Sequence, residues 1–105
     1  MNTILLLAAL AIPPDAASIV DGAIADVARR FAVKAEAVEV QHVTWPDGSL
    51  GCPQEGMLYT QRTMPGWRIV LAAGSRSFQY HAADRGKAFP CPPGRAQTPL
   101  PDSQT

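Results

Sequence analysis

One stretch, Trp45–Pro53, constrains the fold of this 105-residue chain more than any other. Its sequence, Trp-Pro-Asp-Gly-Ser-Leu-Gly-Cys-Pro, combines two prolines, two glycines and one of only two cysteines in the chain. A strand would not tolerate the two prolines, and a flexible polar linker would not need a tryptophan and a cysteine. We therefore expect a rigid, ordered loop that is anchored at one end by the sulfur of Cys52.

The size of the chain indicates one domain. Without its ends, about 75 residues remain to fold, and a domain of that size buries only about 60% of its unfolded surface, so a covalent cross-link would matter for its stability. Nine basic and nine acidic residues give a net charge of zero, and no run of Lys or Arg stands out. This composition disfavours nucleic acid and anionic membranes as partners, and 47% hydrophobic residues argue against disorder of the whole chain.

The N-terminal residues 1–12 are almost entirely apolar, and Ala9-Leu10-Ala11 resembles the cleavage site of a secretory signal. The run is shorter than the about 20 residues that span a bilayer, and no Lys or Arg precedes it. We interpret it as a signal-like leader; the alternatives are a start codon assigned too late and a leader that stays attached. Export predicts a periplasmic or secreted protein without a membrane span after leader removal, and any partner would be an envelope or extracellular protein.

Cys52 and Cys91 support export, because two cysteines in a small exported domain usually form one disulfide. Closing a loop of about 40 residues would stabilise the fold by roughly 3–4 kcal/mol in the chain-entropy model. The alternative is a free, nucleophilic or metal-binding Cys52, for which His42 or His81 would supply the base.

An amphipathic helix is expected from Asp15 to Ala32. Apolar residues recur in it at steps of three and four, namely Ile19, Val20, Ala23, Ile24, Val27, Ala28 and Phe31. Acidic residues come early in this segment and basic residues late, as the helix dipole prefers.

Strands are expected after the helix. Alternating or aromatic-rich segments are residues 37–45, 57–62, 67–72 and 77–81, with a short edge segment at 88–91. In the first segment the apolar parity switches between Val40 and Val43, which we explain by a bulge near Gln41–His42. Turns are expected at Pro65–Gly66, Gly74–Ser75 and Asp84–Lys87.

These elements predict an α+β fold, with one N-terminal amphipathic helix packed on an antiparallel meander of about four strands. The predicted organisation is the leader at residues 1–12, a single domain at 13–91 and a proline-rich, disordered tail at 92–105.

Two resemblances extend this prediction. The helix and curled sheet, closed by a hairpin of Gly66–Leu71 and Ser77–His81, resemble the PepSY-type or cystatin-like topology of small exported bacterial domains. The Trp45–Pro53 motif, with Tyr59, Gln61, Pro65-Gly66 and Tyr80-His81 after it, is similar to a group of uncharacterised small secreted bacterial proteins. This second resemblance covers roughly residues 38–91 and implies no activity or site residues.

The sequence carries no motif that assigns an enzymatic activity. It has no Gly-rich phosphate loop, no H-E-x-x-H, no G-x-S-x-G and no C-x-x-C pair. We therefore name no catalytic residue, no metal ligand and no cofactor. A hydrolytic set would be drawn from Asp47, Ser49, His42 and His81, and a metal site from the two histidines and a thiolate, but neither has a characteristic spacing.

Candidate binding residues lie on or beside the expected loop: Trp45, Asp47, Ser49, Tyr59, Gln61, Tyr80 and His81. Structural roles compete with binding, since Asp47–Gly48 suits a turn in which the carboxylate accepts from an amide two residues on. We expect a non-enzymatic binding or peptidase-inhibitor-like module that uses the disulfide-held loop 45–56. The alternative is a small hydrolase or metal-dependent enzyme; it would lose its general base if both histidines lay beyond hydrogen-bonding distance of any acid or hydroxyl.

Overall fold

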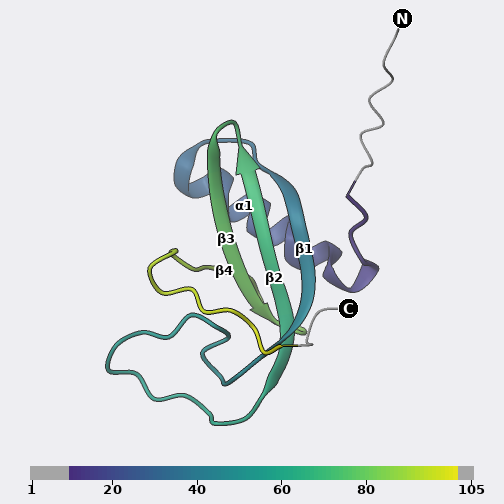
Figure 1. The fold of residues 1–105 in the computed structure, drawn as a ribbon. Coiled ribbons are helices and arrows are strands. Elements are labelled where there is room, and N and C mark those ends of the chain that lie inside the picture. Colours follow the sequence, from purple (N-terminus) through teal and green to yellow (C-terminus); the bar gives the residue numbers. More distant parts are fainter. Residues whose placement is uncertain (1–9, 102–105) are drawn as a thin grey trace, which may run out of the picture.

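The protein is an α+β fold in which one helix covers an antiparallel sheet (Figure 1). The computed structural model describes residues 10–101, so most of the predicted leader and the end of the tail lie outside the described residues. The elements in chain order are a 3₁₀ helix η1 (Pro14–Ala16), α1 (Ala17–Phe31), β1 (Glu36–Trp45), β2 (Met64–Ala73), β3 (Arg76–Ala83) and β4 (Phe89–Pro90). The strand order is β1-β2-β3-β4, and all three pairings are antiparallel. The predicted fold class is confirmed.

Helix α1 follows the predicted amphipathic pattern. Ile19, Val20, Ala23 and Val27 are buried, and the helix ends at Phe31, followed by the capping residue Ala32 with a left-handed φ of 56°. The Ala32 amide donates to the Ala28 carbonyl at 2.9 Å, which satisfies one of the last carbonyl groups of the helix. The first predicted turn differs, because Pro14 begins a 3₁₀ turn before α1 starts at Ala17.

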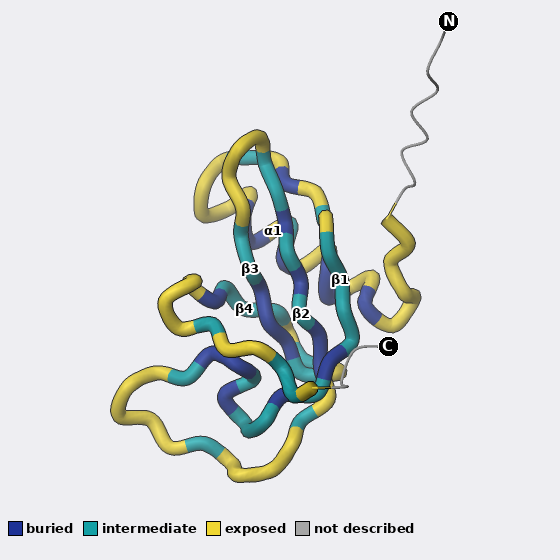
Figure 2. Tube along the Cα trace, in the orientation of Figure 1, coloured by how far each residue is buried: buried dark blue, intermediate teal, exposed yellow. Residues whose placement is uncertain are grey.

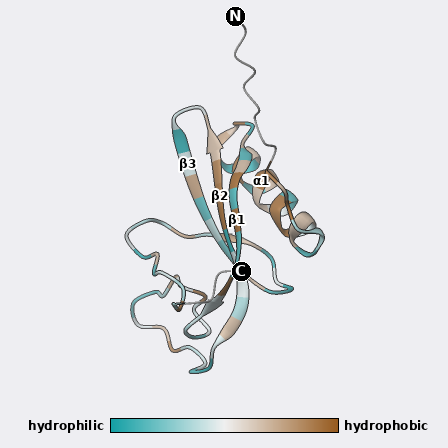
Figure 3. Cartoon of the chain, turned by 45° about the vertical axis from the view of Figure 1, so that its right-hand side comes forward, coloured by the Kyte–Doolittle hydropathy of each residue, from teal (hydrophilic) through white to brown (hydrophobic). Residues whose placement is uncertain are grey.

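The main core lies between α1 and one face of the sheet. Trp67, Ile69 and Leu71 of β2 are buried there, together with Tyr80 and Ala82 of β3. Hydrophobic stretches of α1 and β2 stand out in brown in Figure 3. The alternation predicted for residues 67–72 is confirmed, because Trp67, Ile69 and Leu71 are buried whereas Arg68 and Val70 are more accessible.

One buried carboxylate connects the two layers. Asp26 on α1 accepts a hydrogen bond of 2.6 Å from the Tyr80 hydroxyl and pairs with Arg30 at 2.7 Å and with Arg29. Burial acts to raise the pKa of Asp26, but the Tyr80 hydroxyl and the two guanidinium groups outweigh it and hold the pKa below its usual value. Burial and the neighbouring Asp26 raise the pKa of Tyr80, so its hydroxyl stays a donor.

The predicted bulge near Gln41–His42 is wrong. The register between β1 and β2 shifts between Ala37 and Glu39 and is regular through Gln41 and His42. The extra residue is Val38, whose side chain is 51% exposed. The parity switch has another cause: Val40 packs on the α1 side, whereas Val43 and Trp45 are buried on the opposite face of the same regular strand.

Two further predictions fail in the segment before Trp67. Residues 57–62 form no strand, and Pro65–Gly66 is not a turn, because β2 already begins at Met64. Gly66 lies where a Cβ atom would be 2.1 Å from the Ala82 carbonyl oxygen and 3.0 Å from the Trp45 ring. It is therefore a glycine of close approach, a role that glycine also has within strands. The turns at Gly74–Ser75 and Asp84–Lys87 are found as predicted.

A second layer covers the other face at one end of the sheet. It consists of the long loop (residues 46–63), which joins β1 to β2, and the C-terminal segment (residues 92–101) (Figure 1). The C-terminal segment returns to the domain, since Gln97 donates its amide to the Gly51 carbonyl at 2.8 Å and Leu100 donates to Thr44 at 3.0 Å. The proposed domain limits and the disorder of the tail stay predictions.

Candidate functional site

A disulfide joins Cys52, in the inner half of the long loop, to Cys91, as predicted. The Cα atoms of the two residues are 5.9 Å apart, and β4 ends directly before Cys91. The bond ties the loop to the last strand of the sheet. Because both cysteines of the chain are in this bond, the alternatives of a nucleophilic thiol and a thiolate metal ligand do not apply.

Beneath the loop, Trp45 and His81 form a buried stack. Both are fully buried, with ring centroids 4.3 Å apart and an interplanar angle of 24°. The Trp45 indole donates to the Ala82 carbonyl at 3.3 Å. Gly51 completes the packing, because a Cβ atom there would be 2.3 Å from the Trp45 ring and its φ is 73°.

The hydrogen bonds of His81 determine its tautomer. Its Nδ1 lies 2.7 Å from the Leu50 carbonyl oxygen, which only accepts, so Nδ1 carries the hydrogen. Its Nε2 lies 2.7 Å from the Gln79 side-chain amide nitrogen, which only donates, so Nε2 accepts. Burial lowers the pKa of His81; the Leu50 carbonyl opposes this shift and Arg68 adds to it. The neutral imidazole thus joins the loop to β3.

Asp47 forms the predicted turn at the start of the loop. Its carboxylate accepts from the Ser49 amide at 2.8 Å, and the Ser49 hydroxyl and amide together hold the pKa of Asp47 below its usual value.

The outer half of the loop is braced by hydrogen bonds within the loop. The Met57 amide donates to the Gln54 carbonyl at 3.2 Å, and the Gln54 amide donates to the Tyr59 hydroxyl at 3.0 Å. The Gly48 amide donates to the Thr60 carbonyl at 2.8 Å. Between these contacts Leu58 is 98% exposed, and its neighbour Met57 is 57% exposed. Figure 2 shows the contrast between the buried inner part of the loop and its exposed outer part.

The seven sequence-predicted binding residues are not brought together on one surface. Four of them are buried, namely Trp45, Ser49, Tyr80 and His81, and three are accessible, namely Asp47, Tyr59 and Gln61. Gln61 donates its side-chain amide to the Tyr59 carbonyl at 3.2 Å, but Tyr80 lies on the other side of the sheet, against α1. Tyr59, Gln61 and Tyr80 therefore do not form a common patch. A binding role for the seven stays a prediction.

A histidine–carboxylate pair lies on the α1 side of the sheet. His42 Nε2 is 2.8 Å from the Asp84 carboxylate, and the His42 ring packs edge-on against Trp67 at 4.7 Å. The pair borders a cleft of about 380 Å³, whose other lining residues are Pro13, Asp15, Val40 and Trp67. An acid thus lies within reach of one histidine, so the condition that would have removed a general base is not met.

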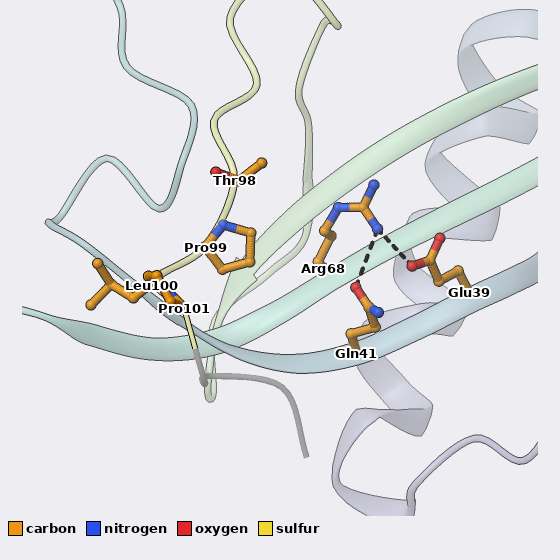
Figure 4. A pocket seen from close by; sticks show the side chains of 7 residues that line it. All are labelled: Glu39, Gln41, Arg68, Thr98, Pro99, Leu100 and Pro101. Atoms are coloured by element: carbon orange, nitrogen blue, oxygen red, sulfur yellow. Dashed lines mark hydrogen bonds and ion pairs between the residues drawn. The ribbon is translucent and has the colours of Figure 1, made fainter.

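A second cleft, of about 620 Å³, lies between the polar face of the sheet and the C-terminal segment (Figure 4). Arg68 lies in it, 2.8 Å from the Glu39 carboxylate and 3.3 Å from the Gln41 side-chain oxygen. Thr98 to Pro101 form the opposite wall. Because Glu39 already neutralises the guanidinium, this cleft offers no unpaired charge to an anion.

Across residues 10–101, no three His, Cys, Asp or Glu side chains lie close enough to hold a metal ion. No helix in that part of the chain is long and apolar enough to cross a membrane.

The residues that sequence reasoning missed are Leu58, Met57 and Asp84. The sequence did contain an indication for Met57 and Leu58. The run Met57-Leu58-Tyr59 is apolar without alternation, so it lacks the polar face of a half-buried strand. No sequence pattern indicated Asp84, because its contact with His42 depends on the antiparallel pairing of three strands.

Comparison with known proteins places the chain in a family. No curated protein and no solved structure gives a significant match. A family model matches residues 20–91, which run from α1 to the second half-cystine and make up more than half of the chain. The chain belongs to this family, described as a domain of unknown function (DUF8738).

Proposed function

We propose that the chain is a small exported, non-enzymatic binding module whose long loop contacts a partner protein in the manner of a peptidase inhibitor. The observation that carries the proposal is the 98% exposure of Leu58 on a loop that is fixed at its base. A large apolar side chain in water gains about 1.5–3 kcal/mol when a partner buries it. Isolated exposed apolar residues are common on proteins, but this one lies beside exposed Met57 at the outer end of a braced loop.

The base of the loop is suited to rigid presentation. The disulfide, the buried Trp45 ring and the His81–Leu50 hydrogen bond hold its inner half. A loop that is already ordered loses little conformational entropy on docking, which is how rigid binding loops gain affinity.

The predicted binding residues divide into two roles in this proposal. Asp47, Tyr59 and Gln61 supply accessible polar groups on the same loop as Leu58, whereas Trp45, Ser49, Tyr80 and His81 are buried and support the fold from inside. A polar rim around an apolar anchor is the usual anatomy of a protein interface.

Export is part of the proposal, because the module would meet its partner in the periplasm or outside the cell. The disulfide is compatible with an oxidising compartment. The partner would then be an envelope or extracellular protein.

Site-specific photo-crosslinking tests the binding role. A photoreactive residue replaces Leu58 in one variant and Val38 in the other, and each oxidised protein is exposed to the native exported fraction. Val38 is a matched control because it is also an exposed apolar residue, at 51%, but lies on the β1 bulge. We expect one discrete adduct from position 58 and none of the same mass from position 38. The same adducts from both positions, or none from position 58, would refute a role for the loop.

A second candidate function is hydrolysis, which the His42–Asp84 pair favours. If the Nε2 hydrogen is donated to Asp84 at 2.8 Å, Nδ1 is left as the basic nitrogen. The residues lining the adjacent cleft include no Ser, Thr or Cys, so the nucleophile would be water. Turnover of small esters or peptides that disappears in His42→Gln and Asp84→Asn would support this function, and turnover unchanged in both variants would exclude it.

A further inference from the structure

We infer, resting on the proposed function, that the partner is a peptidase whose specificity pocket takes a large aliphatic side chain, and that Leu58 is the side chain that enters it. Three features of the loop carry this inference: the side chain at its tip, the free backbone on either side of it, and the bonds that hold both flanks.

The side chain defines the class of pocket. Leu58 is 98% exposed, so no part of the described chain, residues 10–101, competes with a partner for its surface. Peptidases select their substrates by the pocket that receives the side chain before the cleaved bond, and an apolar pocket accepts leucine whereas a pocket with a carboxylate at its base requires Lys or Arg. Leu58 therefore predicts inhibition of peptidases that have an apolar specificity pocket, and no inhibition of trypsin.

The backbone around Leu58 is available to a peptidase cleft. Residues 57–61 have no regular secondary structure, and Leu58 makes no backbone hydrogen bond to any other residue in the described range 10–101. Its amide and carbonyl are free to pair with a strand of the partner, as an extended peptide does when it adds to a sheet edge.

Both flanks of Leu58 are held independently. On the N-terminal side, the Met57 amide donates a hydrogen bond to the Gln54 carbonyl at 3.2 Å, and Cys52 forms the disulfide with Cys91. On the C-terminal side, the Thr60 carbonyl accepts from Gly48 at 2.8 Å, and β2 begins at Met64. These bonds fix the segment before it binds, which lowers the entropic cost of entering the cleft.

The same bonds explain why such a loop would inhibit instead of being consumed. Hydrolysis of the Leu58–Tyr59 bond adds one water, giving a carboxyl group on Leu58 and an amino group on Tyr59. Because both new ends stay attached to the folded domain, the amine remains near the carboxyl carbon at a high effective concentration. Resynthesis of the bond then competes with product release, so net cleavage is slow.

An inhibition assay with a specificity change tests the inference. The oxidised full chain is titrated into chymotrypsin, which has an apolar specificity pocket, and into trypsin, each with a chromogenic peptide substrate. The wild type is expected to inhibit chymotrypsin and not trypsin. Leu58→Asp should weaken the inhibition by about 100-fold, as loss of a central anchor does. Leu58→Lys should transfer inhibition from chymotrypsin to trypsin.

Val38→Asp is the matched control and should inhibit chymotrypsin like the wild type. Circular dichroism and a thiol titration confirm that each variant is folded and oxidised. Absence of chymotrypsin inhibition by the wild type, inhibition unchanged by Leu58→Asp, or rapid and complete cleavage after Leu58 would each overturn the inference. A non-peptidase crosslinked at position 58 would also overturn it while leaving the proposed function intact; the absence of both inhibition and a crosslink would overturn the two together.

Discussion

At the scale of single residues, the packing of the Trp45 ring requires glycine at two positions. Gly51 lies above the Trp45 ring and Gly66 lies beside it, and a Cβ atom at either position would be no more than 3.0 Å from the ring. Gly66 was predicted to belong to a turn, because the dipeptide Pro65-Gly66 is typical of turns. The close approach that it serves depends on a ring from another strand, which local sequence does not indicate.

Gly51→Ala is expected to destabilise the protein by about 2–4 kcal/mol, combining overpacking of the core with strain at a positive φ. The new methyl group would overlap the Trp45 ring at 2.3 Å, and the φ of residue 51 is 73°. Urea unfolding followed by tryptophan fluorescence measures the change. Gly94→Ala is the control, since nothing lies within 4 Å of its Cβ position; equal stability of the two variants would contradict the packing.

At the scale of elements, the sequence predicted those segments whose apolar pattern faces one covered side. Helix α1, strand β3 and the apolar face of β2 are of this kind, and their positions are confirmed. The apolar pattern gave a wrong prediction where the covered face of a strand changes along its length. Along β1, Val40 packs on the α1 side whereas Val43 is buried on the opposite face. The apolar residues of this regular strand therefore change face, which is the pattern that a bulge would also produce.

The candidate site was only partly predictable for the same reason. The disulfide and the Asp47 turn follow from local composition and are confirmed. Residues 57–62 were predicted as a strand, but nothing in the described chain covers Leu58. Which apolar residues stay in water depends on tertiary packing, and that information is not local.

Acid is expected to loosen the contact between the long loop and β3. Because burial lowers the pKa of His81 below its usual 6.5, the unfolded chain takes up a proton before the folded protein does. This contribution to stability is complete above pH 6.5 and is lost as the pH falls from 6.5 to the folded-state pKa, with a slope of at most about 1.4 kcal/mol per pH unit. Arg68 is the charged group that adds to this effect.

The measurement is the free energy of unfolding between pH 8 and pH 5. His81→Gln should flatten the slope, because the neutral amide has no proton to take up in this range. A slope that persists in His81→Gln would show that another group carries it.

At the scale of the whole molecule, the sheet is covered on both faces by different means. Helix α1 covers one face with aliphatic side chains, whereas the long loop covers part of the other through the Trp45–His81 stack and a disulfide. In a small domain such a cross-link is a large part of the total stability.

Replacing both cysteines by serine is expected to lower the free energy of unfolding by about 4 kcal/mol, because the bond closes a loop of 39 residues in sequence separation. Thermal unfolding of the double variant and of the wild type, each without reductant, measures the loss. Adding a reductant should destabilise the wild type to a similar extent and leave the double variant unchanged. Equal stability of the oxidised wild type and the double variant would contradict a structural role for the bond.

The central claim is that a preformed loop presents Leu58 to a partner protein. The most direct test is calorimetric titration of the partner captured by crosslinking, against the wild type, Leu58→Asp and the control Val38→Asp. The account predicts a dissociation constant about 100-fold higher for Leu58→Asp, because a central apolar anchor typically carries a large share of the binding energy. It predicts no change for Val38→Asp. Dissociation constants within twofold of each other for all three proteins would contradict it.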